Sequence, residues 1–470
     1  MLGDKINMNK IDIKNIFPYK KLHFIGIGGV SMSGLCEILL AEGGYNISGS
    51  DNNNSELIEN LIKKGVKVYI GQNKENITPD IDLVIYTAAI KEDNPEFIKS
   101  KELGLKMVER SSFLGELMKA YKYPLCIAGT HGKTTTSSMV SEVFLQAKKD
   151  PTISIGGILS SINSNFKVGK KDYLVLETCE YCDTFLKFNP HSAIILNIDE
   201  DHLDYFKDIN QIYDSFKKFA NLIKNDACLV INSDIKDYEK IIKDLKCSVI
   251  TYGQNEDSMW QAKDISFDEF GYASYKAYYN NNLMYNIKLS VVGLHNVYNS
   301  LSVCALAHFY NLDKNSIEQG LNNFKGTNRR FQYKGTVNGV KIIDDYAHHP
   351  TEILATIKAA KSQNINKLWC VFQPHTYTRT KALLDDFAKA LLDVDNILIC
   401  DIYSAREKDN GEIHSKDLVN KIKEFGKNAI YIESFECGKD FIEKNCQHND
   451  MLITMGAGNV NLLGEMLLSE

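Results

Sequence analysis

Residues 128–136, AGTHGKTTT, constrain this chain more than any other part of its sequence. They follow an apolar run, residues 124–128, that predicts a buried strand. They precede residues 137–147, where apolar side chains recur at helical spacing. A strand, a glycine loop and a helix can bind nucleotide phosphates, because the loop amides and the helix N-terminus point at the anion. Lys133 supplies a mobile positive charge, and the Thr134 hydroxyl can bind Mg²⁺. The segment therefore predicts a protein that consumes ATP or GTP.

The loop departs from the usual Walker A spacing, in which a glycine lies six residues before the lysine. Ile127 occupies that position here, and the nearest glycine is Gly129. The alternative interpretation is a chance Gly-Lys-Thr after a strand. The predicted strand before the loop and the predicted helix after it favour a phosphate site.

Chain length and residue patterns predict three α/β blocks, which meet near residues 122 and 330. At about 150 residues per domain, the chain of 470 residues suggests three domains. Strand-like and helix-like segments alternate throughout, which favours parallel sheets. We predict helices over residues 31–41 and from about residue 295. We predict strands at residues 22–27, 45–49, 66–70, 82–86, 124–128, 173–176, 193–198, 228–232, 340–343, 368–372, 397–400 and 451–454.

Charge and hydropathy exclude several classes of protein. Lys and Arg total 54 against 60 Asp and Glu, and no segment forms a basic stripe, which argues against nucleic acid as a partner. No apolar run is long enough to cross a membrane, so membrane insertion is not expected. The first 14 residues lack the apolar core of a signal peptide, so we expect a cytoplasmic protein.

The eleven cysteines are scattered and odd in number, which argues against a disulfide framework. Cys126, Cys304, Cys370 and Cys400 lie within apolar runs and are interpreted as buried thiols. The single CxxC pair, residues 179–182, has no second pair to complete a four-ligand zinc site. A metal or redox role for that pair is the alternative.

Glycines at the end of the first predicted strand indicate a nucleotide-containing ligand. Residues 26–31 read GIGGVS, and Asp51 ends the second strand, where an acidic residue can meet a ribose hydroxyl. Ser31 replaces the third glycine of the dinucleotide fingerprint, which favours a UDP-linked or other nucleotide over NAD or FAD. A tight turn without a ligand is the alternative.

Carboxylates and histidines follow strands of the second block. Glu177 follows residues 173–176, and Asp199, Asp201 and His202 follow residues 193–198. Because parallel strands end at the ligand crevice, we expect Glu177 and His202 to meet the phosphate loop near the γ-phosphate. Oxygen ligands suit Mg²⁺. A histidine is an unusual magnesium ligand, so taken alone His202 is interpreted as a structural hydrogen-bonding group.

Three further segments carry candidate ligand-binding groups. Residues 293–299, GLHNVYN, open an apolar helix. They either cap that helix or bind adenine, with the Asn296 amide reading the base and His295 stacking on it. Residues 344–352, DDYAHHPTE, and residues 373–379, QPHTYTR, each follow a strand of the third block. Six of the eleven histidines (131, 202, 295, 348, 349 and 375) lie in these segments, in the phosphate loop or after residue 198, which indicates a shared site.

A family resemblance rests on seven segments that occur in order from His23 to Thr380. They are HFIGIGGVSMSG, GTHGKTTT, NIDEDHLDYF, GLHNVYN, FKGTNRRF, DDYAHHPTEI and QPHTYTRT. Together they resemble the Mur ligases over essentially the whole chain, and most closely the alanine-adding members. The resemblance implies an α/β protein of three domains: a Rossmann-like UDP-sugar-binding domain (1–122), a central P-loop-type ATPase domain with a mainly parallel sheet (123–330), and a Rossmann-like C-terminal domain on the amino-acid side (331–470).

The resemblance also implies a reaction. L-alanine is joined to the lactyl carboxylate of UDP-N-acetylmuramate through an acyl phosphate. The products are UDP-N-acetylmuramoyl-L-alanine, ADP and phosphate, in cytoplasmic peptidoglycan precursor synthesis. ATP and Mg²⁺ are the implied cofactors. UDP-N-acetylmuramate and L-alanine are the implied partners of a monomer or weak homodimer.

Site residues carried over from the family motifs fall into groups. Those implied for the nucleotide are Gly129, Thr130, His131, Gly132, Lys133, Thr134, Thr135, His295, Asn296, Arg330 and Asp345. Those for the UDP-sugar are Gly28, Gly29, Val30, Ser31, Met32, Asp51 and Thr87. For metal, Thr134 and Glu177 are implied to hold one Mg²⁺ and His202 a second cation near the acceptor carboxylate, so the family resemblance overrides the structural interpretation of His202. Those for the amino acid and acyl phosphate are Tyr346, His348, His375, Arg379 and Arg406. Those implied to be catalytic are Lys133, His202, Arg330 and His348.

Alternatives remain at this stage. A murein peptide ligase adds a preformed tripeptide to the same UDP-sugar, and Tyr346 and Glu352 favour the alanine-adding branch over it. An oxidoreductase would need the dinucleotide fingerprint that Ser31 interrupts. A nucleotide-gated scaffold would not need the clustered metal and phosphate groups. The role of Glu180 and carbamylation of Lys217 stay open.

Overall fold

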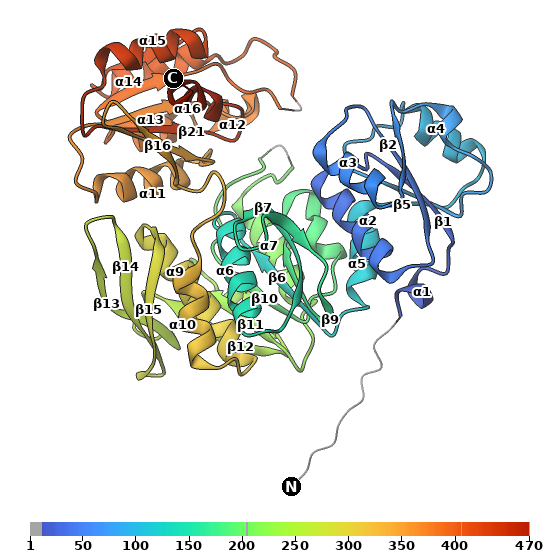
Figure 1. Cartoon of the computed structure of the whole chain (residues 1–470). Helices are drawn as coiled ribbons and strands as arrows, with labels where there is room; N and C mark the ends of the chain where they lie inside the picture. The colour runs from blue at the N-terminus through green and yellow to red at the C-terminus, as the bar shows by residue number, and fades with distance from the viewer. Residues whose placement is uncertain (1–11, 204, 406, 470) are drawn as a thin grey trace.

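Three sheets, each in its own α/β domain, organise the computed structural model, which describes residues 12–203, 205–405 and 407–469 (Figure 1). The predicted α/β class and the division into three sheets are confirmed. All twelve predicted strands are present, with ends that differ from the prediction by at most three residues. Arg406, predicted on the amino-acid side, lies outside the described residues.

The N-terminal domain has five parallel strands in the order β3-β2-β1-β4-β5. Its strands are β1 (Lys21–Ile25), β2 (Asn46–Asp51), β3 (Lys67–Ile70), β4 (Leu83–Tyr86) and β5 (Met107–Glu109). Its helices are α1 (Ile13–Ile16), α2 (Val30–Glu42), α3 (Glu56–Lys63), the 3₁₀ helix η1 (Lys74–Asn76), α4 (Pro95–Glu102) and α5 (Arg110–Met118). The strand order reverses between β1 and β4, which is where a doubly wound sheet opens its ligand crevice.

The central domain carries a ten-stranded sheet in the order β15-β14-β13-β12-β11-β10-β6-β9-β7-β8. Its strands are β6 (Tyr123–Ala128), β7 (Pro151–Leu159), β8 (Ser164–Lys167), β9 (Lys170–Glu177), β10 (Ser192–Ile195), β11 (Cys228–Asn232), β12 (Ser248–Gly253), β13 (Trp260–Phe267), β14 (Tyr272–Tyr279) and β15 (Asn282–Val292). Its helices are α6 (Lys133–Gln146), the 3₁₀ helix η2 (Tyr181–Lys187), α7 (Ile209–Ala220), α8 (Glu239–Ile242), α9 (Leu294–Phe309) and α10 (Lys314–Asn323).

Antiparallel strands extend this sheet at both ends, beyond the parallel strands predicted from sequence. β8 pairs with β7, and β13, β14 and β15 form a meander. On β14, Ala273, Tyr275 and Ala277 are buried and alternate with more exposed residues, as expected for a strand with one covered face. Asn280 and Asn281 both have positive φ, which suits the tight turn that joins β14 to β15.

The C-terminal domain has six strands in the order β16-β17-β21-β18-β19-β20, parallel except for the β16–β17 hairpin. Its strands are β16 (Gln332–Val337), β17 (Val340–Asp345), β18 (Leu368–Phe372), β19 (Asn396–Ile399), β20 (Ala429–Tyr431) and β21 (Met451–Met455). Its helices are α11 (Pro350–Lys361), α12 (Tyr377–Ala382), α13 (Leu384–Leu391), α14 (Ser415–Glu424), α15 (Phe435–Asn445) and α16 (Asn461–Leu468). Asn338-Gly339 makes the hairpin turn, and Pro350 opens α11, where its fixed φ suits a first helical residue.

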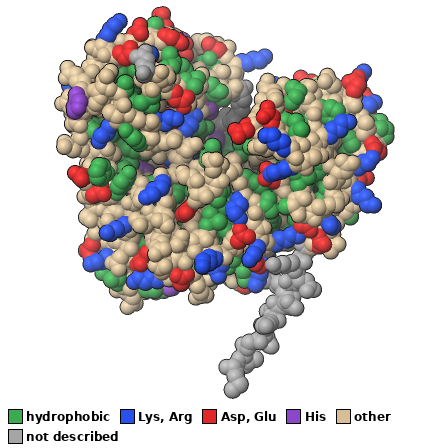
Figure 2. All heavy atoms as spheres, viewed as in Figure 1, with side chains coloured by type: hydrophobic (Ala, Val, Ile, Leu, Met, Phe, Trp, Pro, Cys, Tyr) green, Lys and Arg blue, Asp and Glu red, His purple; other side chains and the backbone are tan. Residues whose placement is uncertain are grey.

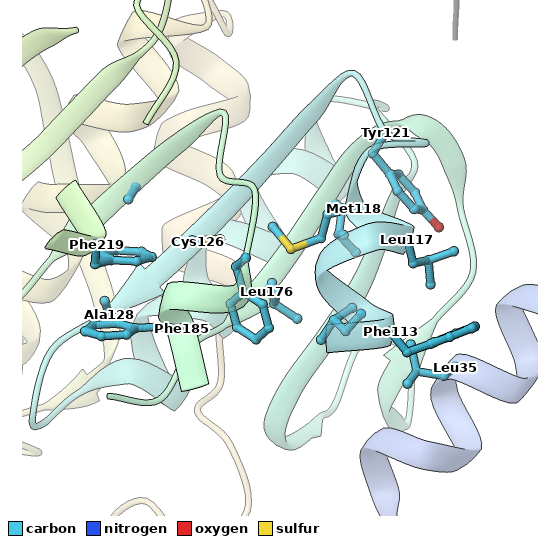
Figure 3. Close-up of a cluster of buried hydrophobic side chains, with 14 of the residues drawn as sticks. Leu35, Phe113, Leu117, Met118, Tyr121, Cys126, Ala128, Leu176, Phe185 and Phe219 are labelled. Carbon is cyan, nitrogen blue, oxygen red and sulfur yellow. The ribbon is translucent and has the colours of Figure 1, made fainter. Parts of the chain in front are cut away.

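One apolar core joins the first two domains. Figure 3 shows Leu35 of α2 and Phe113 of α5 in the same cluster as Leu176 of β9 and Phe185 of η2. Helix α5 packs closely against the end of η2, since a Cβ atom built on Gly115 would lie 1.9 Å from the Lys187 carbonyl oxygen. A continuous hydrophobic core therefore joins the phosphate loop to the ligand crevice of the N-terminal domain.

The cysteines agree with the prediction of free, partly buried thiols. All eleven thiols are free, and Cys126, Cys304, Cys370 and Cys400 are buried. Figure 2 shows acidic and basic side chains intermingled on the face it presents, which is hollowed between the C-terminal and N-terminal domains. Within the described ranges, the chain has no helix that is both long enough and apolar enough to cross a bilayer.

Candidate active site

The phosphate loop connects β6 to α6. Helix α6 begins at Lys133, four residues before the predicted start, so Lys133 and Thr134 belong to its first turn. Gly132 precedes the helix with φ of +80°, and Gly129 has φ of +139°, conformations that favour glycine. A Cβ atom on Gly132 would lie 3.0 Å from Asn299 Oδ1, so the loop packs against α9. The backbone amides in the first turn of α6 therefore point into the loop, where they can bind an anion.

Lys133 lies inside this loop. Its Nζ donates to the carbonyl oxygens of Gly129 at 2.5 Å and Thr130 at 2.9 Å, and lies 3.2 Å from Glu180 Oε2. Burial disfavours the charged form of Lys133, but the nearby negative groups, Glu180 foremost and Glu177 among them, together outweigh burial and raise the lysine pKa. Lys133 thus carries its positive charge at neutral pH. Glu180, whose role the sequence left open, is the buried counter-ion.

Thr134 and Glu177 lie side by side. The Thr134 hydroxyl donates to Glu177 Oε1 at 2.9 Å, and the Gly156 amide of β7 donates to Oε2 at 2.7 Å. Arg330 Nη2, from the segment before β16, donates to the same threonine oxygen at 3.3 Å. A Cβ atom on Gly156 would lie 2.7 Å from Glu177 Oε2, so only glycine leaves this space open. The hydroxyl and carboxylate oxygens fit the hard donor set that Mg²⁺ prefers.

His202 lies beside Glu180, the counter-ion of Lys133. Its Nε2 is 4.0 Å from Glu180 Oε1 and 3.9 Å from Asp201 Oδ2, and its ring lies 4.7 Å from the ring of Tyr181. Burial lowers the pKa of His202, so the imidazole is neutral and can accept a cation. Among the described side chains, no three His, Cys, Asp or Glu groups are arranged to hold a metal ion. The predicted set of Thr134, Glu177 and His202 therefore stays a prediction.

His131 links the phosphate loop to the C-terminal domain. Its Nε2 lies 3.1 Å from Asp199 Oδ2, and its Nδ1 lies 3.2 Å from Glu352 Oε1 of α11. Burial disfavours the imidazolium, but Asp199 and Glu352 outweigh burial and raise the pKa of His131 to about 9. His349 adds a further contact between the two domains, since its Nε2 lies 3.0 Å from the Glu200 carbonyl oxygen.

The residues predicted to bind the amino acid and the acyl phosphate lie together on the C-terminal side of the interface between the central and C-terminal domains. The ring of His348 lies 5.5 Å from Tyr346 and 5.7 Å from His375. Arg379 Nη1 lies 3.2 Å from His375 Nδ1. The guanidinium of Arg330 lies 5.2 Å from the centre of the Tyr346 ring, which connects this group to the Thr134 hydroxyl.

A cavity of about 710 Å³ lies between the phosphate loop, α9, the segment before β16 and α11. Predicted nucleotide residues that line it are His131, Gly132, Thr135, His295, Asn296, Arg330 and Asp345. Asn296 is buried, donates to the Val292 carbonyl at 2.8 Å and accepts from Asn299. The N-cap of α9 is Gly293, so the Asn296 side chain is not the cap of this helix.

Two ionisable groups in the cavity wall have shifted pKa values. The side chain of His295 is accessible from the cavity, while the surrounding protein desolvates it and lowers its pKa to about 4. Burial raises the pKa of Asp345 to about 6, although its oxygens accept from the amides of Phe331 and Ala347. The neutral His295 ring suits contact with an uncharged base.

The predicted UDP-sugar residues lie at the reversal point of the first sheet. The Gly28 amide donates to Asp51 Oδ2 at 2.9 Å, and Val30, exposed, opens α2. Gly26 abuts Thr87, the residue after β4, because a Cβ atom on the glycine would lie 2.8 Å from Thr87 Cγ2. Gly29 is the N-cap of α2, and Ser31 is its second residue. Met32 differs, since it is buried in the apolar core.

Several residues at these sites were not assigned from sequence. Arg110 Nη1 donates to Ser31 Oγ at 3.0 Å and brings a cation to the first crevice. Asp201 binds Arg379, and Glu352 binds His131. Asp201 and Glu352 lie within the segments NIDEDHLDYF and DDYAHHPTEI, so their positions beside histidines were the available signal.

Three family models match consecutive parts of the chain. The model described as "Mur ligase family, catalytic domain" matches residues 21–122. "Mur ligase middle domain" matches residues 127–307, and "Mur ligase, glutamate ligase domain" matches residues 329–458.

Similar proteins extend over the full length. The UDP-N-acetylmuramate–L-alanine ligase of Lachnospira eligens is 52% identical over 98% of this chain and 100% of its own. The protein of the same name from Acetivibrio thermocellus is 49% identical over 98% of each chain. A crystal structure of UDP-N-acetylmuramate–alanine ligase MurC from Thermotoga maritima aligns with a TM-score of 0.79 and 27% identity, over 95% of this chain and 98% of that one.

Proposed function

Since this chain belongs to the Mur ligase family, we propose that it joins L-alanine to the lactyl carboxylate of UDP-N-acetylmuramate and consumes ATP. The full-length identity of about half to relatives that bear this activity in their names carries the proposal. The site supports it, because the phosphate loop, the Thr134–Glu177 pair and Arg379 of the C-terminal domain border one region. The enzyme is a ligase of peptidoglycan synthesis.

The reaction has two steps that these residues can assist. A lactyl carboxylate oxygen attacks the γ-phosphorus of ATP, and ADP leaves, which forms an acyl phosphate. The alanine amine then attacks the acyl carbon, and phosphate leaves as the C–N bond forms. Phosphoryl transfer depends mainly on positioning and on neutralising negative charge. We assign that neutralisation to Lys133 and Arg330.

His348 has the hydrogen bonds of a proton acceptor. Its Nδ1 lies 2.9 Å from the Tyr346 carbonyl oxygen, which can only accept, so Nδ1 carries the proton and Nε2 carries the lone pair. Burial lowers the pKa of His348 to about 4, which keeps the ring neutral. We assign to Nε2 the proton that the alanine amine loses on attack.

Thr134 and Glu177 would hold one Mg²⁺, and His202 would hold a second cation near the acceptor carboxylate. Both ions would neutralise negative charge on the reacting groups. The acyl phosphate reacts with water, so the site needs cover. Contacts of Glu352 and Arg379 with the central domain supply that cover from the C-terminal domain.

The remaining assignments complete the proposal. Arg379 binds the alanine carboxylate, His295 and Asn296 bind adenine, and the turn at Gly28 binds the UDP diphosphate at the N-terminus of α2. ATP and UDP-sugars are cytoplasmic metabolites, so we propose a cytoplasmic enzyme. We propose that it acts as a monomer or weak homodimer.

Phosphate release by the purified protein tests the activity. The assay contains Mg²⁺, ATP and UDP-N-acetylmuramate, with L-alanine, the tripeptide of a murein peptide ligase, or no acceptor. We expect release with L-alanine alone. Preference for the tripeptide would assign the protein to the murein peptide ligases, and no release from protein that still binds ATP would overturn the proposed chemistry.

A further inference from the structure

Two aromatic rings at the β13–β14 turn border the nucleotide cavity. Phe270 is 56% exposed and Tyr272 is 38% exposed, and their ring centres lie 6.2 Å apart. Both side chains line the cavity that also contains His131 and Gly132 of the phosphate loop. Large apolar rings that remain exposed beside a cavity indicate a ligand surface.

The Asp268 side chain and backbone hydrogen bonds fix the turn that carries these rings. Asp268 Oδ1 accepts from the amides of Phe270 and Tyr272, each at 2.9 Å. The Asp268 amide donates to the Tyr272 carbonyl at 3.1 Å, and Gly271 has φ of +79°. The rings are therefore presented by a preformed turn, so a ligand does not have to order the backbone.

A chain of contacts connects the turn to the phosphate loop. Tyr272 pairs with Val292, and the Val292 carbonyl accepts from the Asn296 side chain. Asn299 donates to Asn296 at 3.0 Å, and its side chain abuts Gly132. The cavity thus runs from the phosphate loop, along the first turns of α9, to the aromatic turn.

The C-terminal domain closes the same end of the cavity. A Cβ atom built on Gly271 would lie 3.3 Å from Ser362 Oγ and 3.5 Å from Gln363 Cγ, which follow α11. Tyr333 of β16 is 60% exposed and also lines the cavity. The aromatic turn therefore forms an outer wall at the interface of two domains, opposite the phosphate end.

We propose that Phe270 and Tyr272 form the wall against which the purine base of the nucleotide packs, so that they select a nucleoside triphosphate over its phosphates alone. The proposal deepens the proposed function, from which it takes ATP as the nucleotide. An aromatic ring is attracted to the π-face of a base and excludes water from it. Asn296 donates to the carbonyl of Val292, the strand partner of Tyr272. Its amide therefore lies where it can hydrogen-bond to the edge of a base held by the two rings.

The test compares a nucleotide with its phosphate moiety. Calorimetry with Mg²⁺ measures the affinity of ATP and, separately, of tripolyphosphate, which has no base. For Phe270→Ala we expect the ATP affinity to fall about tenfold, with the tripolyphosphate affinity unchanged. Phe267→Ala is the matched control, because Phe267 is 45% exposed on β13 and is not among the residues that line the cavity.

A second variant gives a direct signal. Phe270→Trp should restore ATP affinity, and ATP but not tripolyphosphate should quench its fluorescence. The native Trp260 and Trp369 are buried, so the new indole is the exposed one. In the ligase assay, Phe270→Ala should raise the KM for ATP with kcat preserved.

Two outcomes would overturn the proposal. One is an ATP affinity of Phe270→Ala equal to that of the unmodified protein and of Phe267→Ala. The other is an equal loss of tripolyphosphate affinity, since the turn would then act on the phosphate site. Binding is measured without the acceptor substrates, so failure of the alanine ligase reaction is a separate result.

Discussion

Arg379 of the C-terminal domain donates two hydrogen bonds to Oδ1 of Asp201 in the central domain, from Nε at 3.1 Å and from Nη2 at 2.8 Å. Both side chains are about nine-tenths buried. Burial opposes the charge of Asp201, but Arg379, together with the nearby histidines, outweighs burial and holds the pKa of that carboxyl well below its usual range. The pair therefore stays ionised and orients the guanidinium across the domain interface.

Removing either member should weaken alanine binding selectively. Asp201→Asn should raise the KM for L-alanine about tenfold, because Arg379 loses a charged hydrogen-bond partner and its fixed orientation. Arg379→Ala should raise the KM for L-alanine further. Arg379→Lys should give a KM between those of the unmodified protein and Arg379→Ala, since lysine keeps the positive charge but loses the paired N–H donors of the guanidinium. Steady-state kinetics with each substrate varied check this. An ATP KM that rises as much as the alanine KM would contradict it.

Lys133 should contribute mainly to the rate of phosphoryl transfer. Lys133→Ala removes a buried positive charge beside the phosphate loop, so we expect kcat to fall about 100- to 1,000-fold. Lys218→Ala, an exposed lysine on α7, is the control and should keep full activity. Phosphate release at saturating substrates is the measurement. A Lys133→Ala enzyme with an unchanged kcat would remove the lysine from the mechanism.

Replacing Gly156 should raise the Mg²⁺ concentration that the enzyme needs for activity. In Gly156→Ala, the new methyl group would press on Glu177 Oε2, which the glycine amide now orients. We expect the Mg²⁺ concentration for half-maximal activity to rise about tenfold, as for other groups that orient a metal ligand. Ile158→Ala, at an exposed position on the same strand, should leave it unchanged. If both variants respond alike to Mg²⁺, the glycine has no role at Glu177.

The phosphate loop was predicted well from local sequence, because Gly132, Lys133 and Thr134 are consecutive residues at the start of one helix. The metal group stays a prediction. The sequence predicts that Glu177 and His202 meet near the phosphate loop, and in the structure the ring of His202 lies beside Tyr181 and Glu180. Strand ends indicate which side chains share an edge of a sheet, but the loops after the strands decide which of them touch.

Contacts between domains could not be predicted from spacing. Glu352 and His131 are 221 residues apart in the sequence, and Asp201 and Arg379 are 178 apart. Each pair depends on how two separately folded sheets are oriented. The meander β13–β15 was missed for a different reason, since its alternating pattern mixes Tyr and Lys, whose long side chains are only partly covered.

The contact of His131 with Glu352 predicts that stability depends on pH. The folded protein raises the pKa of His131 to about 9 from an ordinary value of 6.5. A raised pKa stabilises the folded state in full below about pH 6.5, and this contribution is lost as the pH rises through about 9. The shift corresponds to about 3 kcal/mol. The charged groups around the imidazole are Asp199 and Glu352, and the ring of His349 lies 4.6 Å away.

His131→Gln removes the titrating group and keeps a hydrogen-bonding side chain. Its thermal midpoint should lie below that of the unmodified protein at pH 6.5, and the difference should shrink toward zero near pH 10. Glu352→Gln should reduce the same pH-dependent difference in part, because Asp199 still faces the imidazole. Scanning calorimetry across this range is the measurement. A constant difference between pH 6.5 and 10 would mean that packing, and not the charge on His131, joins the phosphate loop to α11.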